Sequence, residues 1–267
     1  GDCMDLSTAD KMMIQVPMFH CFGMVLAMTA SVTHGSTMCP IPAFSPRKSL
    51  NCINKEQITA FHGVPTMFIA MLENENFAST DFSHMRTGIM AGSPCPVKVM
   101  EEVIEKMHMP EICITYGQTE ASPATTMSKT SDSIEARVNT VGAAIFGVEC
   151  KIVDPETGED LPDNVDGEFV ARGYNIMKGY YKMPQATAAA IDENGWLHTG
   201  DLARRRSVDG YYKITGRIKD MIIRGGENIY PKEIEDFLYT NPKVKDVQVI
   251  GVPSADYGEE IMACIIL

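Results

Sequence analysis

Residues 196–235 read WLHTGDLARRRSVDGYYKITGRIKDMIIRGGENIYPKEIE, and they combine more turn residues and charged groups than a plain structural core needs. The stretch holds an acid, Asp201, within a Thr-Gly-Asp run, and an arginine, Arg217, just ahead of Asp220. The glycine pair Gly225-Gly226 and the start of a helix follow. We interpret this stretch as a site for the sugar of a nucleotide at a joint between two moving domains.

The first 140 residues alternate short apolar runs with segments of helical period, an order typical of a parallel sheet covered by helices. The expected strands are residues 12–17, 89–91 and 112–116. The expected helices are residues 24–32, 56–62, 64–73 and 97–107. We therefore expect an α/β fold with a parallel sheet in residues 1–140, and such sheets bind ligands where their strands end.

Residues 141–219 consist of short alternating segments separated by turns, which predicts a β-rich, barrel-like subdomain or a distorted sheet. One helix is expected inside it, at residues 184–191. We expect this subdomain to complete a large domain that begins with the parallel sheet.

Residues 220–267 begin a small α/β domain. A strand at residues 221–223 leads through the glycine pair to a helix that starts at Pro231. Two further strands, residues 247–252 and 261–267, are expected to pair. The sequence ends inside the last strand, so we expect this domain to be truncated.

Composition narrows the classes of partner. The net charge of −12 disfavours nucleic acid as the main partner, because proteins that bind its phosphates are usually basic. The best apolar run, residues 22–32, is too short to cross a bilayer, so no membrane span is expected. The eight cysteines form no CxxC pair, which disfavours a zinc ribbon and suits the buried, reduced thiols of a cytoplasmic protein. A monomer and a homodimer both remain open.

Two turns after expected strands carry groups suited to a nucleotide. Gly92-Ser93-Pro94 follows the strand at residues 89–91, and Tyr116-Gly117-Gln118-Thr119-Glu120 ends the strand at residues 112–116. An aromatic ring can stack on a base, a threonine hydroxyl can bond a phosphate oxygen, and a carboxylate can hold magnesium. A polar turn that only caps a strand is the alternative, but several such groups in sequence favour a ligand site.

Three motifs, residues 116–120, 199–201 and 216–235, occur in an order and at separations that resemble the adenylate-forming enzymes. This superfamily comprises acyl-CoA synthetases, luciferases and the adenylation domains of peptide synthetases. The resemblance covers almost the whole chain and is closest to the fatty-acyl-CoA synthetases, in the branch of acyl-CoA synthetase family member 2 and its bacterial relatives. Residues 17–23 (PMFHCFG) and 91–96 (AGSPCP) also fit that branch.

The resemblance implies an AMP-forming ligase whose expected ligands are ATP or AMP, Mg²⁺, coenzyme A and a medium- or long-chain fatty acid. The carboxylate of the acid attacks the α-phosphorus of ATP, which gives an acyl-adenylate and pyrophosphate. The thiol of coenzyme A then attacks the acyl carbon, and AMP leaves. Both steps depend mainly on positioning and charge stabilisation.

The resemblance also implies roles for the turns of the parallel sheet. Gly92-Ser93-Pro94 would line the adenine and acyl region, and Tyr116, with Gly117 beside it, would pack on adenine. Thr119 would contact the α-phosphate, and Glu120 would bind Mg²⁺.

Further roles are implied for the opening stretch. Asp201 would accept hydrogen bonds from both ribose hydroxyls, Arg217 would donate to the ribose, and Ile214 would pack nearby. Asp220 would be the hinge of the small domain, and Gly225-Gly226 would line the tunnel for the pantetheine arm of coenzyme A.

His20 would gate or wall the acyl pocket, although a core or turn histidine is an equally good interpretation. For Tyr212, a role in the site and a purely structural role are likewise equally good interpretations. Asp201 as an ordinary turn acid and Arg217 as a surface ion-pair partner are the minority interpretations.

Other functions on the same scaffold remain open. An aryl-CoA ligase is one, because acyl chain length and aromaticity cannot be read from the sequence. A luciferase-like oxygenase is disfavoured by Arg224, which stands where a lysine is expected. A peptide-synthetase module is disfavoured because such modules usually differ from this chain in residues 220–235. A non-catalytic nucleotide-binding fragment is the non-enzymatic alternative.

The resemblance places a Ser/Thr/Gly-rich phosphate loop with its lysine ahead of residue 1 and a catalytic lysine beyond Leu267. We therefore predict that residues 1–267 alone release little pyrophosphate when supplied with fatty acid and ATP. A coupled pyrophosphate assay checks this, and clear release that depends on both substrates would contradict it.

Overall fold

The computed structural model describes residues 1–93, 95–241, 243–244, 246–254 and 256–267, and it has the mixed α/β fold that the sequence predicts. The chain forms two compact units. Unit 1 consists of Gly1–Glu149 and Arg172–Pro184, and unit 2 consists of Cys150–Ala171 and Gln185–Leu267. The β-rich segment contributes to both units, so the three-part division at residues 140 and 219 remains a prediction.

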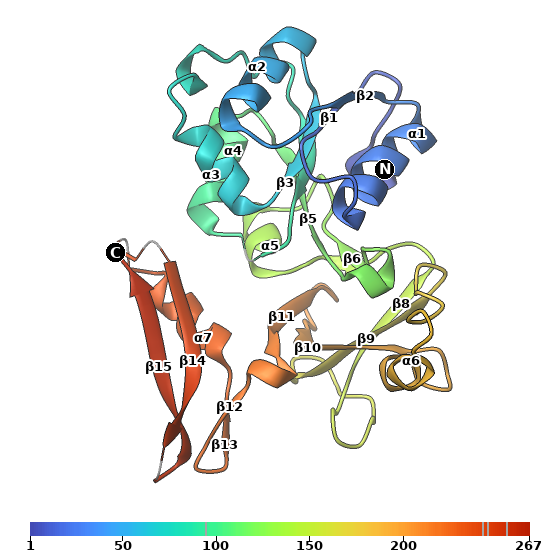
Figure 1. Ribbon diagram of the computed structural model, residues 1–267, viewed down its shortest axis with the longest axis vertical. Coiled ribbons are helices and arrows are strands. Elements are labelled where there is room, and N and C mark those ends of the chain that lie inside the picture. The colour runs from blue at the N-terminus through green and yellow to red at the C-terminus, as the bar shows by residue number, and fades with distance from the viewer. Residues whose placement is uncertain (94, 242, 245, 255) are drawn as a thin grey trace. The chain divides into compact units, whose positions relative to one another are not determined.

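Unit 1 is built on a seven-stranded sheet with the order β2-β1-β3-β4-β5-β6-β7 (Figure 1). Its strands are β1 (Lys11–Ile14), β2 (Thr37–Pro40), β3 (Ala60–Gly63), β4 (Thr87–Met90), β5 (Glu111–Tyr116), β6 (Thr126–Met127) and β7 (Ala143–Ala144). Strands β2 to β5 in this order run parallel, and β6 and β7 continue the sheet antiparallel. The predicted parallel sheet and its three expected strands are confirmed, with small changes in their bounds.

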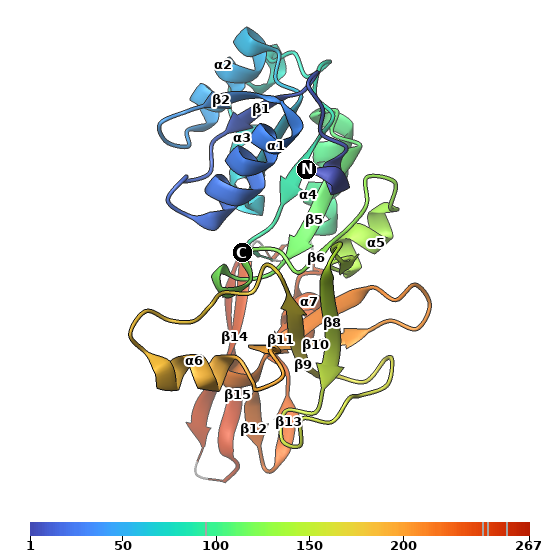
Figure 2. The ribbon, with the colours of Figure 1, turned by 90° about the vertical axis from the view of Figure 1, so that its right-hand side faces the viewer.

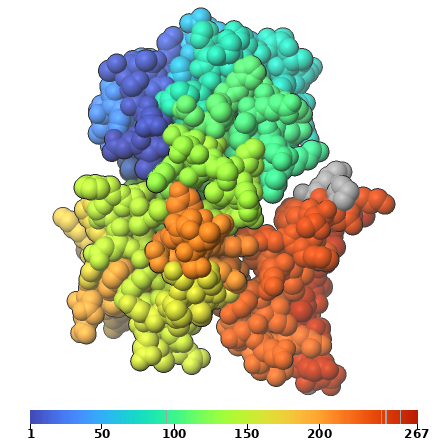
Figure 3. All heavy atoms as spheres, turned by 180° about the vertical axis from the view of Figure 1, so that it is seen from behind, coloured from blue at the N-terminus to red at the C-terminus, as the bar shows by residue number. Residues whose placement is uncertain are grey.

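Helices cover both faces of the parallel strands (Figure 1). The π-helix η2 (Phe22–Thr29) and α1 (Ala30–His34) lie on one face, and α2 (Pro46–Glu56), α3 (Pro65–Leu72) and α4 (Val97–Lys106) lie on the other. Figure 3 shows the cyan and green part of the chain, to which α3 and α4 belong, at the surface of unit 1. The short segments are η1 (Asp2–Met4), η3 (Phe77–Ser79), η4 (Thr119–Ala121) and α5 (Ile134–Asn139).

Successive residues of the strands supply two separate cores. Met12 and Ala60 pack in a cluster with Phe22 of η2, whereas Met13 and Phe61 pack in a cluster with the helices of the other face. Neighbouring strand residues point to opposite faces, and a parallel sheet buries both. The central strands are therefore mostly apolar, and their buried polar side chains, such as His62 and Thr87, are hydrogen-bonded.

The expected helix at residues 56–62 is wrong. Helix α2 ends at Glu56, Gln57 has a left-handed φ of 53°, and residues 60–63 form β3, in which all four residues are buried. A central strand that is buried on both faces lacks the alternation of an exposed strand, so its apolar run is hard to distinguish from a helix by period. The expected helix at residues 64–73 is confirmed as α3, and the one at 97–107 as α4.

The β-rich segment folds as a four-stranded sheet with the order β11-β10-β9-β8 (Figure 2). Its strands are β8 (Val148–Val153), β9 (Gly167–Gly173), β10 (Leu197–Arg205) and β11 (Tyr212–Arg217). Strand β10 pairs antiparallel with both neighbours, and its register shifts on both sides, so the sheet is distorted. The expected helix at residues 184–191 is confirmed as α6 (Pro184–Ala190).

The end of the chain forms a second small sheet, with the order β13-β12-β15-β14. After η5 (Ile218–Asp220) come β12 (Ile222–Arg224), β13 (Glu227–Ile229), α7 (Pro231–Leu238), β14 (Asp246–Ser254) and β15 (Gly258–Ile266). Ile222, Val247 and Val249 form its core, against which Ile234 and Leu238 of α7 pack. The predicted strand, helix and paired strands of this region are confirmed.

All eight cysteines are free thiols, of which Cys113 is buried, six are half-buried and Cys264 is exposed. Burial raises the pKa of Cys95, Cys113 and Cys150 to about 12, which keeps these thiols protonated and unreactive.

In the part of the chain that the structure describes, no helix has the length and apolar character needed to cross a membrane.

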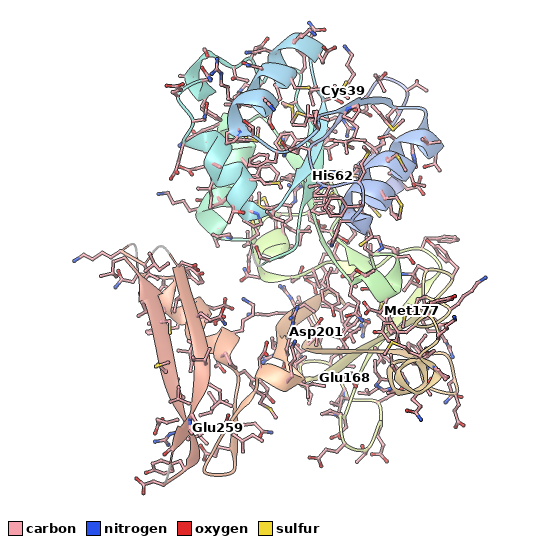
Figure 4. The ribbon with its side chains drawn as sticks, viewed as in Figure 1. Cys39, His62, Glu168, Met177, Asp201 and Glu259 are labelled. Atoms are coloured by element: carbon pink, nitrogen blue, oxygen red, sulfur yellow. The ribbon has the colours of Figure 1, made fainter. Side chains whose placement is uncertain are left out.

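His62 of β3 is a fully buried polar residue between the sheet and η2 (Figure 4). Its Nδ1 accepts a hydrogen bond from the backbone N–H of Ile89 at 3.1 Å, and its Nε2 lies 2.9 Å from the carbonyl oxygen of Leu26. These partners require a neutral ring with its proton on Nε2. Burial lowers the pKa of His62 from 6.5 to about 4.

The lowered pKa of His62 predicts a loss of stability in mild acid. Unfolded chains bind a proton at this ring below pH 6.5, whereas the folded ring resists protonation until about pH 4, so stability falls as the pH drops through this window. When the pH is lowered from 7 to 5, the free energy of unfolding should fall by about 2 kcal/mol less in the His62→Gln variant than in the wild type. Urea unfolding followed by circular dichroism measures the difference, and equal losses in both proteins would contradict it.

Candidate active site

The carboxyl ends of β1, β4 and β5 lie at one edge of the parallel sheet, and the turns after them carry most of the residues predicted for a site in unit 1. The loop after β1 meets the turn after β5, because Cys21 Sγ lies 3.8 Å from Thr119 Oγ1. The structure therefore brings the His20 loop to the 116–120 turn, residues that are about a hundred positions apart in the sequence.

The 116–120 turn is fixed through its backbone. The carbonyl oxygen of Tyr116 accepts hydrogen bonds from the N–H and the hydroxyl of Thr125, at 2.9 and 3.1 Å. Gly117 lies so close to the Pro123 carbonyl that an added Cβ would stand 1.9 Å from its oxygen, so only glycine fits there. Thr119 then begins η4, and its side chain is exposed. Its hydroxyl is accessible to a ligand at the end of β5.

Glu120 is held from the segment that returns to unit 1. Its backbone carbonyl accepts a hydrogen bond from the Met177 N–H at 2.8 Å, and its Oε1 accepts one from the Tyr180 hydroxyl at 2.8 Å. Asn175 donates to the carbonyls of Ala121 and Ala124 at 2.9 and 2.7 Å. No local sequence pattern indicates Tyr180 or Asn175, because both lie in a loop more than fifty residues beyond their partners.

Glu120 fits a magnesium ion that takes most of its ligands from a nucleotide. No group of three or more His, Cys, Asp or Glu side chains in the described residues is arranged to hold a metal ion. Mg²⁺ is commonly bound through one or two carboxylates together with phosphate oxygens and water. A single half-buried carboxylate beside an exposed hydroxyl matches that donor set.

The other predicted residues of unit 1 lie in exposed turns. Gly92, with a left-handed φ of 92°, and Ser93 follow β4, and Pro94 lies outside the described residues. The exposed His20 accepts a hydrogen bond at Nδ1 from the Phe22 N–H at 3.0 Å, which leaves the proton of the neutral ring on Nε2. His20 is therefore no core histidine.

In unit 2, Asp201 and Arg217 face each other across β10 and β11. Arg217 Nε donates to Asp201 Oδ1 at 3.2 Å, and the Asp201 side chain is 12% exposed against 59% for Arg217. Ile214 pairs with Ala203 on the same two strands and is half-buried. Asp201 therefore lies on a strand, and the ion pair with Arg217 joins two residues that the sequence assigned to one ligand.

The turn before Asp201 is supported by a buried acid that the sequence interpretation missed. Glu168 of β9 is 7% exposed, and its Oε1 accepts the Gly200 N–H at 3.0 Å while its Oε2 lies 2.7 Å from His198 Nδ1. Thr199 donates its hydroxyl to the Phe169 carbonyl at 2.6 Å and accepts the Asp201 N–H at 3.2 Å. Figure 4 shows Glu168 and Asp201 on neighbouring strands. The sequence feature that could have indicated this contact is the charged Glu168 within a mostly apolar strand.

Asp220 and the glycine pair lie in the connection to the second small sheet. Asp220 is exposed and ends η5, between β11 and β12. Gly225 and Gly226 form the tight turn between β12 and β13, with φ of 60° and 90°. Positive φ at both positions is the signature of a hairpin turn that favours glycine. The turn is confirmed, and its ligand remains a prediction.

Arg224 and Tyr212 have structural partners. Arg224 Nε donates to Glu260 Oε1 at 2.7 Å, and its guanidinium lies 4.0 Å from the centre of the Tyr257 ring. Tyr212 is 4% exposed and donates its hydroxyl to the Cys150 carbonyl at 2.7 Å. Of the two possibilities left open for Tyr212, the core position is the one observed.

Comparison with known proteins identifies the family. The sequence profile described as "AMP-binding enzyme" matches residues 1–181. The chain belongs to this family. It is 54% identical over 99% of its length to "Putative acyl-CoA synthetase YngI" of Bacillus subtilis and covers 48% of that protein. It is 43% identical over 96% of its length to "Medium-chain acyl-CoA ligase ACSF2, mitochondrial" of Mus musculus and covers 42% of it.

Solved structures of adenylate-forming enzymes share the fold of this AMP-binding chain. ATP-bound MatB from Rhodopseudomonas palustris has a TM-score of 0.89 and 33% identity, with 99% of this chain and 51% of MatB covered. The o-succinylbenzoate CoA synthetase MenE from Bacillus subtilis, in complex with its acyl-adenylate OSB-AMP, has a TM-score of 0.85 and 30% identity, with 98% and 52% covered. The chain spans about half the length of the curated relatives it matches.

The fit of Gly117 in this AMP-binding chain predicts a sharp effect of one methyl group. Gly117→Ala should lower the free energy of unfolding by about 1–3 kcal/mol, because the new Cβ overlaps the Pro123 carbonyl. Gly216→Ala is the matched control, since its Cβ would meet no atom within 4 Å. Urea midpoints of the two variants test this, and similar midpoints would refute the packing argument.

Proposed function

We propose that the protein containing this chain is an AMP-forming acid–CoA ligase that activates a medium- or long-chain fatty acid with ATP and transfers it to coenzyme A. The observation that carries the proposal is the 116–120 turn at the carboxyl edge of the parallel sheet, in a chain of the AMP-binding enzyme family. The names of the relatives YngI and ACSF2 support the same reaction class.

In the first half-reaction, a carboxylate oxygen of the acid bonds to the α-phosphorus of ATP. The bond from that phosphorus to the bridging oxygen breaks, and pyrophosphate leaves. Thr119 would donate its exposed hydroxyl to an oxygen of the α-phosphate, and Tyr116 and Gly117 would flank adenine beside Gly92 and Ser93. These groups act by orienting the phosphate and by stabilising charge that grows in the transition state.

Unit 2 would hold the ribose. The Asp201 carboxylate would accept hydrogen bonds from both ribose hydroxyls, and Arg217, already bonded to it at 3.2 Å, would add a donor. Ile214 would pack beside the sugar. The Glu168 contacts to the Gly200 N–H support this role, because they fix the backbone on which Asp201 stands.

Glu120 would hold Mg²⁺, which when bound neutralises charge on the phosphates. The Tyr180 hydroxyl on its Oε1 would set the direction of the carboxylate. The remaining ligands in this proposal are phosphate oxygens and water.

In the second half-reaction, the thiolate of coenzyme A bonds to the acyl carbon, the bond from that carbon to the phosphate oxygen breaks, and AMP leaves. Gly225 and Gly226 would let the pantetheine arm pass, because neither carries a side chain. Asp220 would be the pivot of the region that follows it. Its exposed position between two sheets supports this role.

The acid would bind by the loop after β1. Met18 and Met24 are 47% and 45% exposed, and Phe19 is 93% exposed, so apolar side chains surround His20 in the sequence. These side chains suit an alkyl chain, with His20 as the wall of its pocket. The protein would act in the cytoplasm as a monomer or a homodimer, without a nucleic-acid partner.

The proposal predicts acid-dependent AMP formation by the full protein, with fatty acids preferred over aromatic acids such as benzoate. Chromatographic measurement of AMP with acids of graded chain length checks the substrate class. A preference for aromatic acids would show that the substrate is an aryl acid and not a fatty acid. The absence of AMP formation with every acid would overturn the proposal that the protein is a ligase.

Asp201→Asn in the same protein should raise the KM for ATP by about tenfold or more, because a charged hydrogen-bond acceptor for the ribose is lost. Asp209→Asn is the matched control, an exposed acid in the turn between β10 and β11. Equal KM values for ATP in the two variants would contradict the proposed role of Asp201 in binding the ribose.

A further inference from the structure

We propose that His62 is a positioning residue for the acid-binding loop, holding η2, and through it His20, against the parallel sheet. The identity of the ligand rests on the function proposed above. The positioning itself rests on contacts within unit 1.

Both ring nitrogens of His62 are used, and each has a partner on a different element. The Ile89 N–H on β4 bonds to Nδ1 at 3.1 Å, and Nε2 donates to the Leu26 carbonyl of η2 at 2.9 Å. The backbone carbonyl of His62 accepts a third bond, at 3.1 Å, from the buried Gln15 side chain at the end of β1. His62 is therefore fixed by two neighbouring strands and extends one donor to η2.

The segment that receives this donor has an unusual form. Residues 22–29 are a π-helix, and π-helical turns are rare and often occur at functional sites. His62 meets η2 twice, since its ring also stacks on the Phe22 ring with centroids 5.8 Å apart and an angle of 11° between planes. One contact lies at the start of η2, and the Leu26 bond lies in its middle. Together they fix the position of the helix and its rotation about its own axis.

The same helix carries the His20 loop. The Phe22 N–H bonds to His20 Nδ1 at 3.0 Å, and the His20 carbonyl accepts the N–H groups of Gly23 and Met24, both at 3.0 Å. Gly23 packs so tightly that an added Cβ would lie 2.4 Å from the Pro17 carbonyl oxygen. A shift of η2 must therefore move His20.

An apolar residue could fill the space of His62 but would leave the Leu26 carbonyl without this donor. Burying a carbonyl that has lost its partner costs free energy, which a shift of η2 toward water would relieve. We expect such a shift to weaken binding at the loop and to leave the 116–120 turn, which is fixed separately, in place.

Two amide variants separate the two ring contacts. In His62→Gln the side-chain amide reaches the place of Nε2, so it can still donate to Leu26. In His62→Asn the amide oxygen takes the place of Nδ1, so the bond from Ile89 is kept and the bond to Leu26 is lost. His62→Leu loses both.

The experiment measures the KM for the acid, the KM for ATP and kcat in the full protein, together with hydrogen exchange of peptides that cover residues 18–29. His62→Asn and His62→Leu should raise the KM for the acid by about tenfold and speed exchange in this segment, with the KM for ATP within about twofold. His62→Gln should stay close to the wild type in both. If His62→Leu does not fold, the comparison of Asn with Gln decides.

Equal behaviour of the Asn and Gln variants, or equal rises in both KM values, would overturn the inference. A wild type that forms no acid-dependent AMP would instead overturn the proposed function. Faster exchange of residues 18–29 in His62→Asn, but not in His62→Gln, would then still support the positioning role.

Discussion

A parallel sheet must be covered on both faces, and in unit 1 this constraint decides where the chemically active groups can lie. The strands carry mostly apolar side chains on both faces, and most of the polar side chains predicted for a site lie in the turns at their ends. Because β1, β4 and β5 run the same way, their final turns meet at one edge. The contact between Cys21 and Thr119 is one consequence, and the exposed Thr119 hydroxyl beside the half-buried Glu120 is another.

In unit 2, the Asp201 side chain is held in place by contacts between antiparallel strands. Antiparallel strands place Asp201 opposite Arg217, while Glu168 and Thr199 pair with the backbone around it. Buried polar groups are stable only when they are hydrogen-bonded, so such a network has few alternative arrangements. In the ribose site that we propose, a carboxylate that is fixed before its ligand arrives would lose little entropy on binding. The same reasoning applies to Glu120, which Tyr180 and Met177 hold in unit 1.

The sequence predicts the elements and motif residues that depend on neighbours along the chain. The turns at 92–93 and 116–120, the antiparallel hairpins and the glycine turn at 225–226 were all available from local pattern. The strand at 60–63 was mistaken for part of a helix because burial on both faces removes the alternation of a strand. His62, Glu168 and Tyr180 were missed for another reason, since their partners lie between 27 and 60 residues away. Such contacts are set by topology, and no periodicity of one sequence reveals them.

In the reaction proposed for the full protein, the acid attacks the α-phosphorus of ATP, and the oxygen that it contributes leaves with AMP. The most direct measurement supplies the full protein with fatty acid labelled with ¹⁸O in its carboxylate, together with ATP and coenzyme A, and weighs the products by mass spectrometry. We expect one ¹⁸O atom in AMP and none in pyrophosphate. Unlabelled AMP, or ¹⁸O in inorganic phosphate with ADP as the other product, would contradict it.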